Sequence, residues 1–124
     1  MSQDIVSDAL NQIMNAKRSN RNSVKIRAYS KFFISILAIG KLRNYIEDYK
    51  SESDGLVVNF GKLNVCKAVK PRYIVKAKMI DKYVRRYLPA RDMGVLIIST
   101  SKGLMTHQTA LEKNLGGSII AYFY

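Results

Sequence analysis

Residues that build covalent or metal-linked structure are scarce in this 124-residue sequence. It contains one cysteine, one histidine and no tryptophan. A single cysteine excludes a disulfide within the chain, and Cys66 and His107 together are too few for a structural zinc site with four protein ligands. We therefore expect no metal and no cofactor. Cys66 is expected to be a small buried hydrophobic residue in a reducing compartment, and His107 a surface or packed histidine rather than a general base.

Long hydrophobic runs are absent as well. The longest, "FFISILAIG" at 32–40, has about half of the ~20 residues that span a bilayer. The N-terminal "MSQDIVSDAL" carries acids where a secretory signal needs positive charge. These features predict a cytoplasmic protein with no membrane partner. A chain of this length fits one compact domain or two very small ones, so a large enclosed enzyme pocket and a small-molecule substrate are not expected.

Acidic residues are few compared with basic ones. The sequence has 21 Lys plus Arg against 9 Asp plus Glu, a formal net charge of +12. The basic residues lie in tracts: 17–43 holds eight and no acid, and 62–91 holds ten beside the single Asp81. Basic stripes of this kind favour a polyanionic partner, and nucleic acid in particular, over a merely basic soluble surface.

The first half of the sequence predicts a helix–strand–helix–strand–strand unit. Apolar residues recur at helical spacing after a possible cap at Asp4 and continue to Ala16. "SVKIRA" alternates, which predicts a strand at 23–28 with Val24, Ile26 and Ala28 facing a core. Ser30 caps a second helix, for which we predict a buried stripe of Phe33, Ile34, Leu37 and Ala38. "NYIEDYK" and "LVVNF" predict two strands joined through "SESDG", with Asn44 suited to positive φ at the helix exit. One sheet with two helices on a face follows.

Lys31 falls in the first turn of the second predicted helix, where a cation opposes the helix dipole. An anion bound at that turn makes the placement favourable, because the free N–H groups of the turn help to hold it. A lysine extended into water explains the placement equally well. The sequence leaves both interpretations open.

A second domain is predicted where the composition changes after Gly61. The following "KLNVCKAVKPRYIVKAK" is lysine-rich, and Pro71 favours an extended or edge geometry. A helix is predicted in "MIDKYVRRYLPA", a strand covered on both faces in "VLII", a short helix from Thr106 to Lys113 with Gly116 at its C′ position, and a final strand in "SIIAYFY". The prediction is an α+β protein of two small domains, an N-terminal α+β domain at 1–62 and a mostly β domain with short helices at 63–124.

The segment Ser99 to Gly103 follows the predicted buried strand and invites three chemical interpretations. Ser99-Thr100-Ser101-Lys102 matches S-x-x-K, but the other parts of such a hydrolase, an S-D-N and a K-T-G strand, are missing. A P-loop requires a glycine before Lys102, and none is there. Hydroxyls on a tight turn suit ribose and phosphate oxygens of RNA. A turn whose hydroxyls satisfy its own backbone is the structural alternative.

Several longer segments resemble a known family. "LIISTSKGLMTHQTALEKNLGGSIIAYFY" looks like the C-terminal signature of the universal small-subunit ribosomal protein number eight. The segments "DIVSDALNQIMNA", "VKIRAYSK", "GKLNVCKAVKPRY" and "YLPARDMG" follow the family's order, so the resemblance covers nearly the whole chain. The last two are more similar to the archaeal and eukaryotic cytosolic branch than to the bacterial one.

The resemblance implies a two-domain α+β protein without a catalytic step, bound to the central domain of small-subunit rRNA and beside neighbouring small-subunit proteins. In the family, the C-terminal domain recognises rRNA through the segment that is here Ser99, Thr100, Ser101, Lys102 and Gly103. The N-terminal domain adds contacts that match Asn15, Lys17 and Lys31. The position of Lys102 varies in this branch, so the hydroxyls are the firmer part of the assignment. With the basic tracts, the expected RNA-binding residues also include Arg18, Arg72 and Arg86.

Three functions remain open at the level of sequence. The expected one is a structural constituent of the small ribosomal subunit that docks on rRNA and supports assembly and translation. A free RNA-binding regulator of translation would use the same surface. A small serine hydrolase rests on S-x-x-K alone. Tyr73, Tyr122 and Tyr124 either stack on an unpaired base or, as strand aromatics commonly do, belong to the core.

Overall fold

The computed structural model describes residues 5–70, 72–90 and 93–124. The chain divides into two compact units, an N-terminal unit Met1–Lys67 and a C-terminal unit Ala68–Tyr124. The change in composition after Gly61 comes a few residues before this division. Asp4 and Pro71, for which a helix cap and an extended geometry were predicted, lie outside the described residues.

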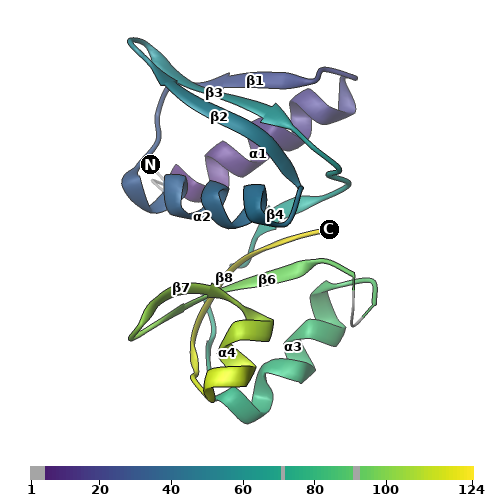
Figure 1. The fold of residues 1–124 in the computed structure, drawn as a ribbon. Helices are drawn as coiled ribbons and strands as arrows, with labels where there is room; N and C mark the ends of the chain where they lie inside the picture. The colour runs from purple at the N-terminus through teal and green to yellow at the C-terminus, as the bar shows by residue number, and fades with distance from the viewer. Residues whose placement is uncertain (1–4, 71, 91–92) are drawn as a thin grey trace. The chain divides into compact units, whose positions relative to one another are not determined.

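The N-terminal unit has the predicted helix–strand–helix–strand–strand order. Its elements are α1 (Ile5–Arg18), β1 (Ser23–Ile26), α2 (Lys31–Leu42), β2 (Ile46–Glu52) and β3 (Gly55–Phe60). The strands form an antiparallel sheet in the order β1-β3-β2. Both helices lie against the same side of this sheet (Figure 1), as predicted. Asn44 has the expected positive φ, +69°, where the chain leaves α2.

Helix α2 begins where predicted but buries a different face. The Ser30 hydroxyl accepts a hydrogen bond from the Phe33 N–H at 3.2 Å, which confirms the N-cap. The buried residues are Phe33, Ile36, Leu37 and Gly40. The predicted Ile34 and Ala38 are only half-buried, so that part of the stripe is wrong. Because "FFISILAIG" is apolar on nearly all sides, its periodicity does not select one face.

Strand β1 is shorter than its alternating sequence suggested. Ile26 is fully buried and Val24 half-buried, whereas Ala28 lies beyond the strand and is exposed. The partner strand sets this limit. Ile26 pairs with Leu56, and β3 starts one residue earlier at Gly55, so no partner strand remains opposite Ala28.

Cys66 closes the core of the N-terminal unit, and its burial confirms the prediction. Only 1% of its surface is exposed. Its backbone N–H donates to Met14 Sδ at 3.2 Å, and its Sγ lies 3.7 Å from the Leu10 carbonyl oxygen. Burial raises the pKa of the thiol from its ordinary 9.0 to about 12. The side chain therefore acts as a small hydrophobic residue packed against α1.

The C-terminal unit is built on an antiparallel sheet with helices on one side (Figure 1). Its elements are β5 (Ile74–Val75), the 3-10 helix η1 (Ala77–Met79), α3 (Ile80–Tyr87), β6 (Val95–Thr100), β7 (Gly103–Thr106), α4 (His107–Lys113) and β8 (Gly117–Phe123). Among the described residues the strand order is β4-β8-β6-β7, and β5 also pairs with β8. Strand β4 (Cys66–Ala68) runs across the division between the units. Together the two units confirm the α+β class.

The core of the C-terminal unit explains the sequence patterns of its helix and central strand. Helix α3 buries Ile80 and Val84 and exposes Lys82, Arg85 and Arg86, in agreement with the helical spacing of its apolar residues. Residues 95–98 of β6 are all buried, in agreement with their unbroken apolar run. The buried cluster consists of Val69, Val75, Ile80, Val84, Leu88, Leu96, Ile98, Met105, Ala110 and Ile119.

Helix α4 starts after the predicted cap and ends at the predicted Lys113, but a different residue adopts the left-handed conformation that follows it. The Thr106 hydroxyl accepts from the Thr109 N–H at 3.3 Å. The left-handed residue at the end of the helix is Asn114, with φ +54°, so the assignment of Gly116 to that position is wrong. Asparagine adopts this conformation more readily than other residues with a Cβ. Gly116 instead lies so close to β5 that a Cβ would collide with the Val75 carbonyl oxygen.

The burial of Cys66 predicts slow thiol chemistry in the folded protein. With its pKa raised to about 12, the native chain holds about a thousandfold less thiolate near pH 8 than the unfolded chain. We expect alkylation by iodoacetamide to be at least about a hundredfold slower in buffer than in concentrated guanidinium. Because the folded pKa is the higher one, this group stabilises the fold fully below pH 9 and loses its contribution between about pH 9 and 12. Equal alkylation rates in both solvents would contradict the buried thiol.

Candidate nucleic-acid interface

The segment Ser99 to Gly103 forms the tip of the β6–β7 hairpin. Ser99 pairs with Leu104 and Thr100 with Gly103, which leaves Ser101 and Lys102 as the two turn residues. Gly103 has a φ of +107°, a conformation that residues with a Cβ rarely adopt. The turn was predicted, but β7 was not, because a four-residue strand that runs directly into a helix leaves little periodicity to detect.

Thr100 holds the turn together from within. Its Oγ1 donates to the Gly103 carbonyl oxygen at 2.9 Å and accepts from the Lys102 N–H at 3.0 Å. This hydroxyl is therefore occupied by its own loop, which is the structural alternative foreseen for the segment. The hydroxyls of Ser99 and Ser101 have no hydrogen-bond partner among the described residues. Thr100 shapes the loop, and the two serines are left to interact with a partner.

The base of the hairpin is supported on both sides. Ser99 of β6 pairs with Leu104 of β7 on one side and with Ser118 of β8 on the other. Gly117 approaches so closely that a Cβ would collide with the Ser99 carbonyl oxygen. The tip projects beyond this three-stranded base (Figure 1), and its residues 101–103 are exposed. Strand pairing on both sides of β6 therefore restricts the movement of the backbone that carries the hydroxyls.

His107 is a packed histidine rather than a surface one. It is 3% exposed, and its Nδ1 accepts a hydrogen bond from the Leu96 N–H at 3.1 Å. The ring thus secures the start of α4 to β6. In the described part of the chain, no group of three or more His, Cys, Asp or Glu side chains is placed to hold a metal ion.

The candidate residues of the N-terminal unit lie at its two ends. Asn15, Lys17 and Arg18 occupy the last turn of α1, and Lys31 is the first residue of α2. Helix α1 has 14 residues, which corresponds to roughly 20 Å at ~1.5 Å per residue. Figure 1 shows that the end of α1 and the start of α2 lie on opposite sides of the unit. The structure therefore does not bring Lys31 together with the other three.

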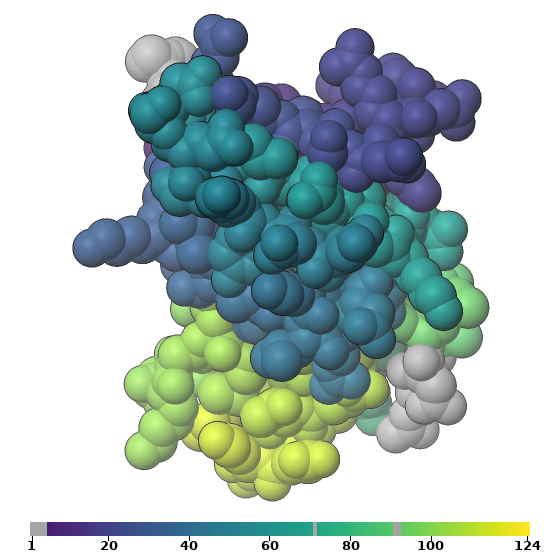
Figure 2. All heavy atoms as spheres, turned by 45° about the horizontal axis from the view of Figure 1, so that its top comes forward, coloured from purple at the N-terminus to yellow at the C-terminus, as the bar shows by residue number. Residues whose placement is uncertain are grey.

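Acidic residues of the N-terminal unit gather on the β2–β3 hairpin, whose outer sheet face is toward the viewer in Figure 2. Lys25 Nζ lies 2.8 Å from Asp54 and 3.5 Å from Glu52, and Lys41 Nζ lies 3.2 Å from Asp48. The hydrogen bond from Lys25 lowers the pKa of Asp54, and that from Lys41 lowers the pKa of Asp48. Two lysines are thereby neutralised locally.

The candidate cations take no part in these pairs. In the ranges that the structure describes, no salt bridge involves Lys17, Arg18, Lys31, Arg86 or Lys102. All of them except the half-buried Lys17 are exposed. Their charge is therefore available to an external anion.

In the C-terminal unit, the basic candidates are separated from the hairpin tip. Arg72 is exposed ahead of β5. Arg86 lies on α3, with its guanidinium 5.5 Å from the ring centres of both Tyr73 and Tyr87. Figure 1 shows α4 between α3 and the β6–β7 hairpin. Arg86 and the serines thus belong to different surfaces of the unit.

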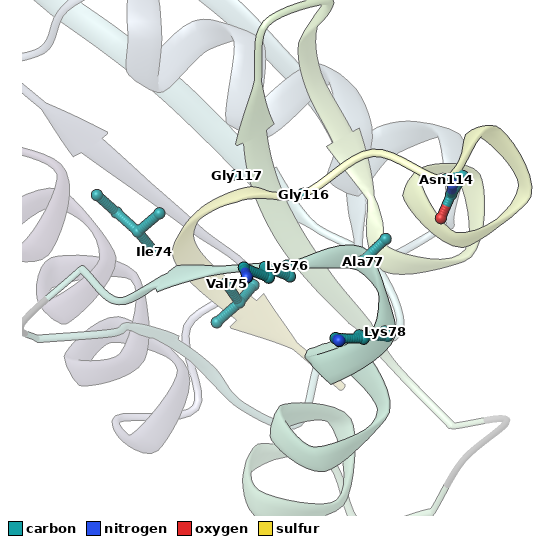
Figure 3. Close-up of a pocket in the computed structure, with 8 residues that line it drawn as sticks. All are labelled: Ile74, Val75, Lys76, Ala77, Lys78, Asn114, Gly116 and Gly117. Carbon is teal, nitrogen blue, oxygen red and sulfur yellow. The ribbon is translucent and has the colours of Figure 1, made fainter.

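An open hollow beside β5 was not foreseen from the sequence. It is lined by β5, η1 and the loop that follows α4, with Lys76 and Lys78 among its side chains (Figure 3). Ile74 at its edge is 85% exposed. The described lining contains no acid, histidine or cysteine, so the hollow offers shape and positive charge rather than a catalytic group.

These features belong to a ribosomal protein. The model of the family described as ribosomal protein S8 matches residues 4–124, and the chain belongs to this family. Among curated proteins, it is similar to the small ribosomal subunit proteins uS8A and uS8B of the fission yeast Schizosaccharomyces pombe. Each is 37% identical over 127 residues, which covers 98% of this chain and 98% of the relative. The expected family and its archaeal and eukaryotic branch are confirmed. No described helix is long and apolar enough to cross a membrane.

Different roles for neighbouring hydroxyls predict different effects on stability. Thr100→Val removes two hydrogen bonds from a half-buried position and should lower the free energy of unfolding by about 1 kcal/mol. Ser101→Ala is the matched control, because the Ser101 hydroxyl has no partner among the described residues and its loss should change stability by less than about 0.5 kcal/mol. Urea unfolding of both variants measures the difference. Equal losses would refute the division of roles.

Proposed function

We propose that this protein is a structural constituent of the small ribosomal subunit in the cytoplasm. It binds the central domain of small-subunit rRNA, lies beside neighbouring small-subunit proteins and supports assembly and translation, without a catalytic step. The observation that carries the proposal is the β6–β7 hairpin, which presents two unoccupied hydroxyls on a rigid support. Membership of the ribosomal protein S8 family and the names of the fission yeast relatives support it.

The chemistry of the hairpin tip suits an RNA groove. Hydroxyl groups both donate and accept hydrogen bonds, so Ser99 and Ser101 can pair with ribose 2′-OH groups, phosphate oxygens or base edges. Lys102, exposed at the same turn, adds a charge for a phosphate. Gly103 adds no side chain at the tip, where a Cβ would meet open space. The tip therefore selects an RNA by the shape of the RNA groove. The hydrogen bonds of Thr100 hold the tip in the conformation that presents the two serines.

The basic surfaces supply affinity rather than selectivity. Asn15, Lys17 and Arg18 at the end of α1 form one cluster, and Lys31 lies at the other end of the unit. With Arg72 and Arg86 they provide phosphate contacts, whose strength falls with salt because bound counterions are released. A binding mode with a selective tip and several charged anchors is what a structural rRNA-binding protein requires.

A hydrolase built on S-x-x-K has less support. Ser99 has no hydrogen-bonded base among the described residues, and the one histidine is buried with its Nδ1 bound to the Leu96 N–H. Nucleophilic serine needs such a base and an oxyanion site. A fluorophosphonate probe that labels Ser99 stoichiometrically would favour the hydrolase over the RNA-binding role.

The proposal predicts that Ser101→Ala weakens binding to cognate RNA selectively. Loss of one or two hydrogen bonds should cost about 1 to 2 kcal/mol on a hairpin from the central domain of small-subunit rRNA, and little on a length-matched plain duplex. Fluorescence anisotropy at several salt concentrations measures both. Equal losses on the two RNAs would show that the tip is not a reader.

Removal of a charge should change the salt dependence of binding and leave the preference for the hairpin over the duplex nearly unchanged. Lys102→Ala is expected to lower the salt slope by about one unit if the lysine contacts a phosphate. Lys50→Ala, an exposed cation of β2 beside Asp48, is the control that changes net charge away from the candidate residues. Wild-type binding that is equal for hairpin and duplex and falls together with salt would overturn the ribosomal proposal.

A further inference from the structure

Five tyrosines and one arginine of the C-terminal unit form a continuous ladder. The ring centres of Tyr73 and Tyr83 lie 5.6 Å apart, those of Tyr87 and Tyr122 lie 5.3 Å apart, and those of Tyr122 and Tyr124 lie 6.1 Å apart. The Arg86 guanidinium links the two groups, at 5.5 Å from both Tyr73 and Tyr87. We call this set the tyrosine–arginine ladder: Tyr83, Tyr73, Arg86, Tyr87, Tyr122 and Tyr124.

The ladder is partly core and partly surface. All five tyrosines pack against the buried cluster of the C-terminal unit, yet each is only half-buried. Arg86 is exposed. The rings come from the segment before β5, from α3 and from the end of β8, so three parts of one unit hold them in place. Packing against the cluster therefore accounts for part of each ring, and the rest of each ring is accessible to a partner.

The charged side chains near Arg86 on α3 are mostly basic. Lys82 and Arg85 are exposed on the same helix, and Asp81 is the one acid within it. Arg86 forms no salt bridge in the described ranges. A guanidinium held against aromatic rings keeps its N–H groups in a fixed plane, which suits a phosphate.

We propose that the tyrosine–arginine ladder is a second RNA contact, which stacks one unpaired base and binds the adjoining phosphate through Arg86. Aromatic rings beside a cationic helix face are the combination that binds single-stranded RNA, since every base offers a face to a ring and every nucleotide brings a phosphate. The inference rests on the proposed RNA-binding function. It deepens that function at Arg86, one of the proposed phosphate contacts, because the ladder adds an unpaired nucleotide as the ligand. Helix α4 separates the ladder from the β6–β7 hairpin (Figure 1), so the two contacts lie on different surfaces of the unit.

The test uses the full chain and an octauridylate that carries one 2-aminopurine at its centre. Stacking of 2-aminopurine quenches its fluorescence, so the same titration reports affinity and stacking. Arg86→Lys keeps the charge and removes the planar group. Arg85→Lys is the matched control on the next residue, which has no ring contact among the described residues.

We expect the wild type and Arg85→Lys to bind within twofold of each other and to quench the probe, and Arg86→Lys to bind at least fivefold more weakly with less quenching. Urea unfolding of each variant separates this effect from a loss of structure. Equal affinity and quenching for the two variants would overturn the proposal. Binding of octaglutamate that Arg86→Lys alone weakens, without a difference on the oligonucleotide, would also overturn it and would assign the ladder to a protein partner.

The two proposals fail separately. Octauridylate contains no hairpin, so its binding does not depend on the selection made by Ser101. If the rRNA hairpin is preferred and Ser101→Ala removes that preference while Arg86→Lys changes nothing, the ladder is refuted and the ribosomal role stands. If the hairpin is not preferred at all, the ribosomal role fails whatever the octauridylate shows.

Discussion

Mutual repulsion among the basic side chains is the constraint on which the rest of this structure depends. A formal net charge of +12 has to be carried by 124 residues, and each of the two units must still bury an apolar core. The N-terminal unit concentrates its acids on the β2–β3 hairpin and neutralises Lys25 and Lys41 there. Most of the remaining described cations of this unit lie at helix ends and in loops, where water and salt screen them. A polyanion that binds this folded arrangement more tightly than the unfolded chain stabilises the fold by mass action.

The units solve the problem of a small core in the same way. Each places an antiparallel sheet against helices on one side, and few polar groups enter the interior. The polar groups that are buried form hydrogen bonds. His107 accepts from the Leu96 N–H, and no buried side-chain nitrogen or oxygen of the described residues lacks a hydrogen-bond partner. Because a buried polar group without a partner is costly, these bonds fix the start of α4 relative to β6 and thereby the base of the hairpin.

Sequence reasoning succeeded where a local pattern has a single structural solution. Ser30 and Thr106 begin helices because their hydroxyls replace a missing backbone acceptor. It failed where two solutions share one pattern. The all-round apolar α2 gave no preferred face, and Asn114 replaced Gly116 as the left-handed residue because the choice depends on how closely β5 approaches. The hydroxyls of the hairpin could be predicted as a group. Their division into the occupied Thr100 and the unoccupied serines required the bond from Thr100 to Gly103.

The position of β8 has a consequence for how the chain acquires its structure. The sheet of the N-terminal unit joins β2 to β3 across a two-residue turn, a contact that forms quickly. In the C-terminal unit, Ile74 pairs with Ser118, forty-four residues further along the chain. The chain loses conformational entropy when so long a loop closes, before the stabilising contacts have formed. This loss lowers the rate at which the pairing forms. Within the C-terminal unit, the local β6–β7 hairpin should therefore form before β5 pairs with β8.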